Sequence, residues 1–358
     1  MQSTQFPFGV SVVICCHNSA ARLPATLAHL VAQKVSKNIP WEVLIIDNAS
    51  TDGTATVARE CWGECHFAPL RIVREQRPGT AFARQRGIAE ARYELVSFVD
   101  DDNWVTDQWV ELTASFLRSH ADVGALGGLS TPVFEVSPPS WFPACKAQYA
   151  ISPETWLGGE CTETRSLWTA GMTLRKSAWQ QLEFKNIPIL VPGRSGGSLT
   201  AGEDTELCYR LRLAGWKLWY EPRLQFQHYM PKDRLNWAYA RRLYRGAGKE
   251  SAALLPYETV LHTEKSEAYS IIKQSWEWKL LATAKGLLLR PRVLMRVATG
   301  NCEGDLEMLY LEVDIGRFTA LARGRSSFYA SINQVKKLAE RLHSRGGERA
   351  IVNEASRS

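Results

Sequence analysis

The chain has 358 residues, of which 45% are hydrophobic and 22% charged, a globular composition that excludes a disordered or fibrous protein. This length suits roughly two domains. The net charge of +6 is uneven: residues 232–358 carry 22 Lys and Arg against 14 Asp and Glu, whereas residues 1–231 carry 21 against 23. We therefore expect one domain over residues 1–231 and a basic region over residues 232–358.

Strand and helix patterns alternate through the first hundred residues. Short β-branched runs predict buried parallel strands at 10–16, 41–46, 70–73 and 95–99, with helices between them at 20–32, 55–60 and 80–91. This alternation predicts an α/β fold with a mostly parallel sheet flanked by helices. A further helix is expected at 203–214, a strand at 216–220, and mostly helical structure beyond residue 235.

The sequence shows neither a membrane-spanning helix nor a secretory signal. Its longest uncharged stretch, residues 1–21, has an apolar part of only residues 8–16, shorter than the about 20 residues that a spanning helix needs. No positive charge precedes this apolar part, as a signal peptide would require. We expect a cytoplasmic protein.

Polar clusters follow three of the expected strands: His17-Asn18, Asp47-Asn48 and Asp100-Asp101-Asp102. Ligands of parallel sheets bind outside the carboxyl ends of the strands, so these clusters should meet at one edge. Three adjacent carboxylates repel one another, and a hard divalent cation would relieve that repulsion. The alternative is a solvated, capped turn before a helix that begins near Trp104.

Three weaker candidates lie elsewhere in the sequence. Glu203 and Asp204 open a helix after a loop, where a carboxylate is stabilised by the helix dipole or acts as a general base. Arg84 would contact a phosphate or the solvent. His228 follows a strand and is either a hydrogen-bonded structural residue or a metal ligand.

Five motifs in a fixed order carry a resemblance that none carries alone. They are Val12-Val13-Ile14-Cys15-Cys16-His17-Asn18, Ile45-Ile46-Asp47-Asn48-Ala49-Ser50-Thr51-Asp52-Gly53-Thr54, Gly79-Thr80-Ala81-Phe82-Ala83-Arg84-Gln85-Arg86-Gly87-Ile88, Phe98-Val99-Asp100-Asp101-Asp102 and Gly202-Glu203-Asp204. In this order the chain resembles the family 2 glycosyltransferases of the GT-A fold over about residues 8–230. The resemblance implies a Rossmann-like catalytic domain with a nucleotide-sugar half at about 8–105 and an acceptor half at about 106–231. A helical C-terminal extension follows.

The resemblance implies an activity and a cofactor. The activity is inverting transfer of a hexosyl group from a nucleotide-diphosphate sugar, with UDP favoured, to a hydroxyl of a glycan or lipid-linked acceptor in polysaccharide or glycoconjugate synthesis. The cofactor is Mn²⁺ or Mg²⁺, with Asp100, Asp102 and His228 as its ligands. Asp204 matches the catalytic base, and Glu203 lies beside it.

The nucleotide-sugar contacts also follow from the resemblance. The matching positions are Cys16, His17, Asn18, Asp47, Asn48, Arg84, Asp100 and Asp101. The chain departs from the family pattern at three of the quoted positions, with His17 for Tyr, Asn48 for Asp and Gln85 for Asn.

Two aromatic-rich regions are candidates for binding the acceptor and the membrane. Trp156 and Trp168 follow the aspartates, where acceptor sugars would stack, although a core role is the alternative for each. Residues 271–295 mix Trp and Leu with Lys and Arg, which is typical of a helix that lies on an anionic membrane surface. A helix on the membrane would make the protein peripheral on the inner face of the plasma membrane. The alternatives for these residues are packing against the catalytic domain and a homodimer contact.

Two other functions compete with transfer. A membrane-surface binding or scaffolding protein that keeps the GT-A fold without turnover would explain the three departures from the family pattern. A nucleotidyltransferase would carry a glycine-rich, basic loop after the first strand, where this chain has Cys16-His17-Asn18-Ser19-Ala20. Nucleic acid is not an expected partner, because the first domain is slightly acidic and the basic region lacks a recognition motif.

Overall fold

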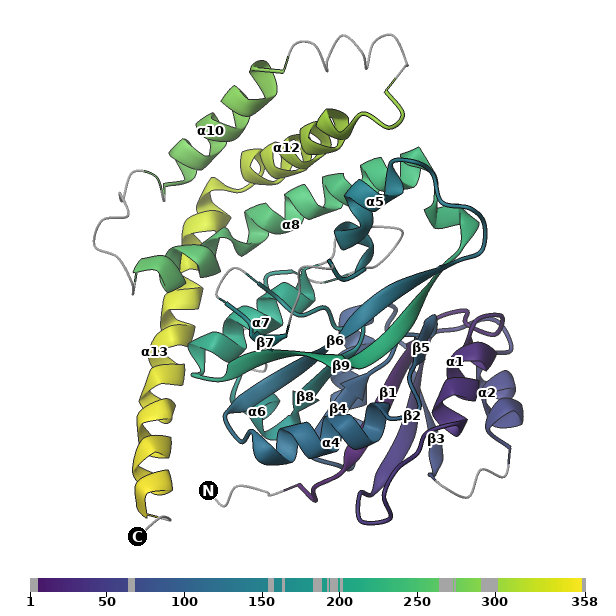
Figure 1. The fold of residues 1–358 in the computed structure, drawn as a ribbon. Helices are drawn as coiled ribbons and strands as arrows, with labels where there is room; N and C mark the ends of the chain where they lie inside the picture. Colours follow the sequence, from purple (N-terminus) through teal and green to yellow (C-terminus); the bar gives the residue numbers. More distant parts are fainter. Residues whose placement is uncertain are drawn as a thin grey trace. The chain divides into compact units, whose positions relative to one another are not determined.

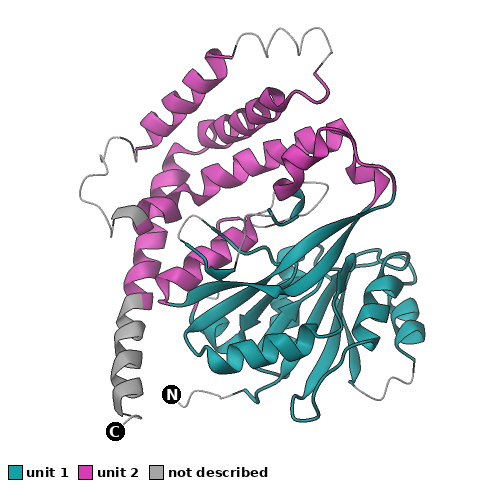
Figure 2. Cartoon of the chain, viewed as in Figure 1, with its two compact units in different colours: residues 1–135, 149–181, 216–230 teal, residues 136–148, 182–215, 231–358 magenta. Residues whose placement is uncertain are grey.

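A computed structural model describes most of the chain as two compact units (Figure 2). Unit 1 comprises residues 1–135, 149–181 and 216–230, and unit 2 comprises residues 136–148, 182–215 and 231–358. The chain passes between the units several times, and the last passage, into unit 2, follows Met230. The residues described are 6–63, 68–153, 158–162, 165–182, 189–191, 193, 199, 202–263, 273, 275–290 and 302–355, without the side chains of 262, 263 and 343–355.

Unit 1 is built on a nine-stranded sheet with the order β3-β2-β1-β4-β8-β6-β9-β5, in which β7 also pairs with β9 (Figure 1). The strands β3, β2, β1 and β4 are parallel to one another. The strands are β1 Val10–Cys16, β2 Trp41–Asn48, β3 Leu70–Glu75, β4 Leu95–Phe98, β5 Asn103–Val105, β6 Val123–Phe134, β7 Gly159–Glu160, β8 Met172–Arg175 and β9 Lys217–Met230. The helices of this unit are α1 Leu23–Val31, α2 Thr54–Trp62, α3 Thr80–Glu90, α4 Trp109–Ser119 and α6 Lys176–Gln181.

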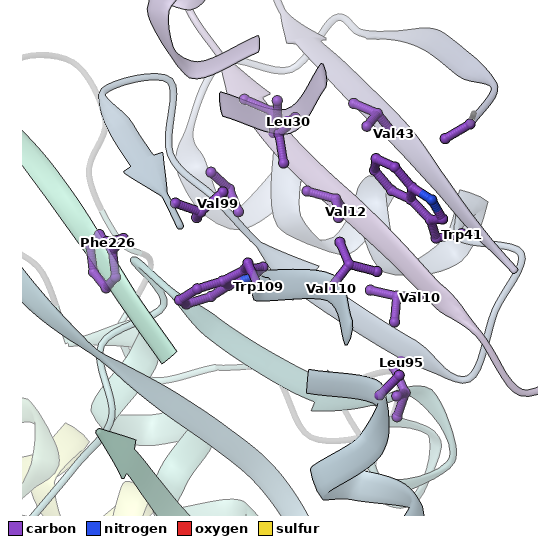
Figure 3. Close-up of a cluster of buried hydrophobic side chains, with 14 of the residues drawn as sticks. Val10, Val12, Leu30, Trp41, Val43, Leu95, Val99, Trp109, Val110 and Phe226 are labelled. Atoms are coloured by element: carbon purple, nitrogen blue, oxygen red, sulfur yellow. The ribbon is translucent and has the colours of Figure 1, made fainter. Parts of the chain in front are cut away.

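The two faces of β1 explain how the helices cover the sheet. Val10, Val12 and Ile14 alternate along the strand, and their side chains join a fully buried cluster with apolar residues of α1, α2 and α4 (Figure 3). The residue between the last two, Val13, points to the opposite face, where it lies against Gly87 of α3. The sheet is therefore covered by helices on both faces, which confirms the predicted α/β class.

The second half of the sheet is mixed and differs in detail from the prediction. The strand β8 runs antiparallel to both β4 and β6, whereas β6 and β9 are parallel. The strand expected at 216–220 continues to Met230, and the long strand β6 was not predicted. The helix expected near Trp104 in the alternative reading of the aspartates is wrong, because Asn103–Val105 pairs with β9 as a strand.

Unit 2 is helical, which confirms the helical C-terminal region. Its α and 3-10 helices are α5 Phe142–Cys145, η1 Lys146–Tyr149 (whose last residue falls in unit 1), α7 Glu203–Leu213, η2 Lys232–Arg234, α8 Trp237–Thr263, α10 Trp276–Leu288, α12 Leu306–Ala322 and α13 Arg325–Ala355. The helices α8 and α12 cross closely at two glycines, Gly248 and Gly316, each of which lies against the backbone of the other helix. None of the helices in the described residues is long and apolar enough to cross a membrane.

The glycine crossing predicts a difference between two Gly→Ala variants. A Cβ at Gly316 would collide with the carbonyl oxygen of Arg245, so Gly316→Ala should lower the free energy of unfolding by about 2–3 kcal/mol. At Gly286 of α10 the nearest atom to an added Cβ is the end of the Asp314 side chain at 3.4 Å. Gly286→Ala should therefore be neutral or stabilising by up to about 1 kcal/mol, since alanine favours the helix. Urea unfolding of both variants checks this, and an equal loss in both would contradict it.

Candidate active site

The first polar cluster lies where β1 and β2 end side by side. Cys16 pairs with Asp47 in the parallel register, so the residues that follow both strands meet at one edge. The His17 ring lies with Nδ1 2.7 Å from the Asn48 carbonyl oxygen. The Asn18 side-chain oxygen accepts from the backbone N–H of Thr51 at 2.8 Å. The sequence places these segments about thirty residues apart, and the sheet brings them together.

The predicted nucleotide contacts in this cluster differ in what they expose. His17 and Asn18 are exposed, whereas Cys16 is fully buried within the apolar cluster of unit 1. The amide of Asn48 is bound to the loop before α3: it donates to the Arg77 carbonyl at 2.7 Å and accepts from the Gly79 N–H at 2.8 Å. Asn48 therefore holds the loop before α3 in place at this edge of the sheet. The Cys16 side chain is buried and is not exposed to a ligand there.

Asp47 keeps its carboxylate near a cation at the same edge. It is buried, it accepts from the Ser50 N–H at 3.2 Å, and its Oδ2 lies 3.6 Å from Arg74 of β3. The side chain of Arg74 is 62% exposed, so its charge is available to a ligand as well. Arg74 was missed in the sequence, where nothing distinguishes it from other strand arginines.

The three aspartates occupy the turn between β4 and β5. The Asp102 carbonyl accepts from the Tyr229 N–H at 2.9 Å, and the register of β5 with β9 places Asn103 opposite His228. As a result the Asp102 Oδ1 lies 3.5 Å from the His228 Nε2, although 126 residues separate them. Both side chains are buried. The structure therefore brings together two of the three predicted metal ligands.

Electrostatics in this turn reflect crowding of negative charge. Burial raises the pKa of Asp100 most; the Arg84 guanidinium opposes the rise, and the charge of Asp102 adds to it. Burial also raises the pKa of Asp101, and Asp102 again adds to the rise. The Arg84 side chain therefore lies close enough to Asp100 to act on its charge.

Asp101 has a partner that sequence reasoning missed. Arg22, just before α1, makes an ion pair with it through Nη2 and Oδ2 at 2.7 Å, and the Thr26 hydroxyl donates to its carbonyl at 2.9 Å. Arg22 is 79 residues away in the sequence, and the one available signal was its place after the first strand, at the same sheet edge. The pair turns the middle carboxylate of the three toward α1.

The donor chemistry at this turn suits a divalent cation. No group of three His, Cys, Asp or Glu side chains stands ready to hold a metal ion among the residues that the structure describes. The adjacent Asp102 and His228 nevertheless provide a hard oxygen and an imidazole nitrogen, a combination that Mn²⁺ accepts. After burial and the opposing charge of Arg84, the negative charge of Asp102 also raises the pKa of Asp100, and a bound cation would offset this negative charge.

The predicted base lies in unit 2. Glu203 and Asp204 form the first turn of α7 and are half-buried, and Asp204 accepts from the Thr205 N–H at 3.1 Å. One turn further, Glu206 and Arg210 form a fully buried ion pair at 2.8 Å, and the Tyr257 hydroxyl donates to Glu206. This network fixes α7 to α8 and so holds the helix that carries Asp204.

Of the two predicted acceptor residues, Trp168 is half-buried in unit 1, and Trp156 lies outside the described residues.

The seven cysteines in the described part of the chain are all free thiols, and five of them are buried. Cys61 of α2 is exposed.

Comparisons with known proteins give matches to glycosyltransferases. Residues 11–142 match the model of glycosyl transferase family 2. Glycosyltransferase AglE of Haloferax volcanii is 32% identical over 128 residues, which are 36% of this chain and 40% of that protein. Succinoglycan biosynthesis protein ExoM of Rhizobium meliloti is 23% identical over 288 residues, which are 80% of this chain and 84% of that protein.

The crystal structure of S. aureus TarS 1-349 in complex with UDP is similar with a TM-score of 0.46 and 14% identity, and the alignment covers 89% of this chain and 91% of that one. The chain spans two fifths of the length of AglE. The match over residues 11–142 covers β1 to β6 and includes the aspartate turn. The match therefore shows a glycosyl transferase family 2 domain over residues 11–142.

Proposed function

We propose that this chain is an inverting glycosyltransferase that moves a sugar from a nucleotide-diphosphate sugar, with UDP as the nucleotide, to a hydroxyl of a glycan or lipid-linked acceptor. The observation that carries the proposal is the meeting of Asp47, Arg84 and the aspartate turn at the carboxyl ends of β2, β1 and β4. That edge is where parallel sheets bind nucleotides. Asp47 would contact the uridine, and Arg84 the diphosphate.

The reaction would use Mn²⁺ or Mg²⁺, held by Asp102 and His228 with Asp100 beside them. A divalent ion, when bound, neutralises negative charge on the diphosphate leaving group. Arg84 would do the same from α3, since its guanidinium already acts on Asp100. Asp101 would stay outside this set, because Arg22 holds its carboxylate.

Asp204 would take the proton from the acceptor hydroxyl, and Glu203 would support the negative field beside it. A single displacement then inverts the anomeric centre, in keeping with the family resemblance. The helix dipole favours a negative charge in the first turn of α7. The buried pair of Glu206 and Arg210 keeps this turn rigid.

The setting would be polysaccharide synthesis at a membrane. The name of ExoM, whose similarity covers most of both chains, supports a polysaccharide product. A lipid-linked acceptor would be reached at the inner face of the plasma membrane, with residues 232–358 on the anionic surface. Trp156 and Trp168 are the proposed acceptor contacts.

Thermal unfolding with nucleotides tests the donor site. UDP with MnCl₂ should raise the melting temperature by a few degrees, because a ligand at a hundredfold excess over its Kd stabilises the folded state by about 2.7 kcal/mol. GDP, dTDP and CDP serve as matched controls, and UDP alone should act more weakly. An unchanged melting temperature with all four nucleotides would contradict the proposal and favour the non-catalytic surface protein.

A further inference from the structure

The helix α10 is held to unit 2 by one face only. The Trp276 indole N–H donates to the Leu321 carbonyl at 2.9 Å, and Trp276 and Leu280 pack against a buried cluster of α8, α12 and α13. Thr283, one turn further, is buried as well. These positions recur every three or four residues, so they form a single stripe that anchors the helix.

The opposite face of α10 is apolar and exposed. The exposed fractions are 45% for Trp278, 65% for Leu281 and 78% for Leu288, with Leu289 just after the helix at 68%. Ala282 and Lys285 are the other exposed positions of the stripe. A helix on the surface of a globular protein normally turns polar side chains to the solvent. Of the six side chains on this outer stripe, only Lys285 is polar.

Three positively charged side chains lie near the Trp278 end of this outer stripe, and one of them is paired with a carboxylate. Arg325, at the start of α13, pairs with Glu277 at 2.6 Å and lies over the Trp276 ring at 5.9 Å. Lys273, five residues before Trp278, is exposed. Arg323 is exposed as well and lies two residues after Leu321, whose carbonyl accepts from Trp276. Acidic residues cluster instead at the start of α12, at Glu303, Asp305 and Glu307. The positive side chains thus accompany the tryptophan end, which is the arrangement of a helix that lies on anionic lipid.

A further aromatic side chain is exposed on the neighbouring helix α12. Arg290, just after α10, pairs with Asp314 of α12 at 3.3 Å, and Trp276 at the start of α10 meets the end of α12. The two helices therefore run antiparallel, and Tyr310, one turn before Asp314, lies toward the Leu289 end. Tyr310 is 57% exposed. Aromatic residues of this kind favour the boundary between lipid and water.

We propose that the outer stripe of α10, namely Trp278, Leu281, Ala282, Lys285, Leu288 and Leu289, binds the interface of an anionic lipid bilayer. A second copy of the chain fits less well, because a two-fold contact over this stripe would enclose both Lys285 ammonium groups in one apolar interface. Anionic headgroups would instead pair with Lys285. The inference rests on the proposed function in one respect, the lipid-linked acceptor that such a position would bring within reach.

Vesicle binding by the full chain tests the stripe. The probes are phosphatidylcholine vesicles with and without about one third phosphatidylglycerol, which adds the negative surface potential. Wild type should sediment with the anionic vesicles, and the double variant Leu281→Gln/Leu288→Gln should lose on the order of tenfold or more in partition coefficient. Lys285→Gln should lose roughly fivefold, on anionic vesicles only. Val31→Gln, at a helix position 41% exposed in unit 1, is the matched control and should bind as wild type does.

Three results would overturn the inference. The first is absence of wild-type binding to either vesicle. The second is equal binding by wild type and the double variant, which would move any membrane contact elsewhere in the chain. The third is a wild-type dimer, seen by sedimentation velocity, that the double variant converts to a monomer without any vesicle binding. The nucleotide-dependent rise in melting temperature is measured without lipid, so failure of the donor site would be seen separately.

Discussion

Replacing Asp102 with Asn should lower the rate of sugar transfer by at least about a hundredfold while the protein stays folded. The Asp102 carboxylate lies 3.5 Å from His228. It is a proposed ligand of the divalent cation that would neutralise the leaving diphosphate. Loss of one such electrostatic contact typically costs about 10²–10³ in kcat. Asn has the same shape, and the backbone bond from Tyr229 to the Asp102 carbonyl does not depend on the side chain.

Initial rates of UDP release at saturating donor and Mn²⁺ measure the effect, with the melting temperature as the test of folding. Removing one charge from a crowded turn should leave the melting temperature unchanged or raise it, since the Asp102 charge works against Asp100 and Asp101. Asp107→Asn is the matched control. Asp107 lies five residues after Asp102, its side chain is 44% exposed, and it makes an ion pair with Lys34. A rate above one tenth of wild type in Asp102→Asn would remove this carboxylate from the mechanism.

Replacing Glu312 with Ala should destabilise unit 2 by about 2–4 kcal/mol. Glu312 of α12 is fully buried, and its two oxygens accept from Arg241 at 2.7 Å and from Arg245 at 2.6 Å, both on α8. Without the carboxylate, both arginines lose their partner at the helix contact. Their side chains are 35% and 46% exposed, so water recovers part of the loss and the effect should stay below that of a fully buried ion pair.

Urea unfolding followed by circular dichroism measures this, and a separate transition for the helical unit would be fitted on its own. Glu307→Ala, in the exposed first turn of the same helix, should stay within about 0.5 kcal/mol of wild type. Indistinguishable curves for the two variants would show that the ion pairs carry no net stability.

The first hundred residues were predictable because their signals are local. Each strand there is a β-branched run, each helix follows a polar turn, and the carboxyl-end rule for parallel sheets placed the three polar clusters at one edge. The strand β6 was missed because glycines interrupt it, and glycine disfavours strands. Its glycines are required by packing at a distance: a Cβ at Gly124 would lie 2.7 Å from Trp216, and one at Gly128 would lie 2.8 Å from Trp109.

The candidate site was predictable in membership more than in arrangement. The meeting of Asp102 with His228 depends on the register of β5 with β9, and the pairing of Arg22 with Asp101 depends on how α1 enters from β1. Neither the strand register nor the position of α1 can be predicted from a local sequence pattern. The resemblance placed Asn48 among the nucleotide contacts, and only the structure shows its amide bound to the loop before α3.

The way the chain alternates between the two units bears on how such a protein can evolve. Val191 and Leu213, from the second segment of unit 2, share one buried cluster with Leu254, Val335 and Leu338 from the last. A fragment that ends at residue 231 would leave the first two without their apolar neighbours, and Glu206 without Tyr257. Substitutions in the last segment of unit 2 must therefore remain compatible with the segments at residues 136–148 and 182–215, which the chain carries between strands of the sheet.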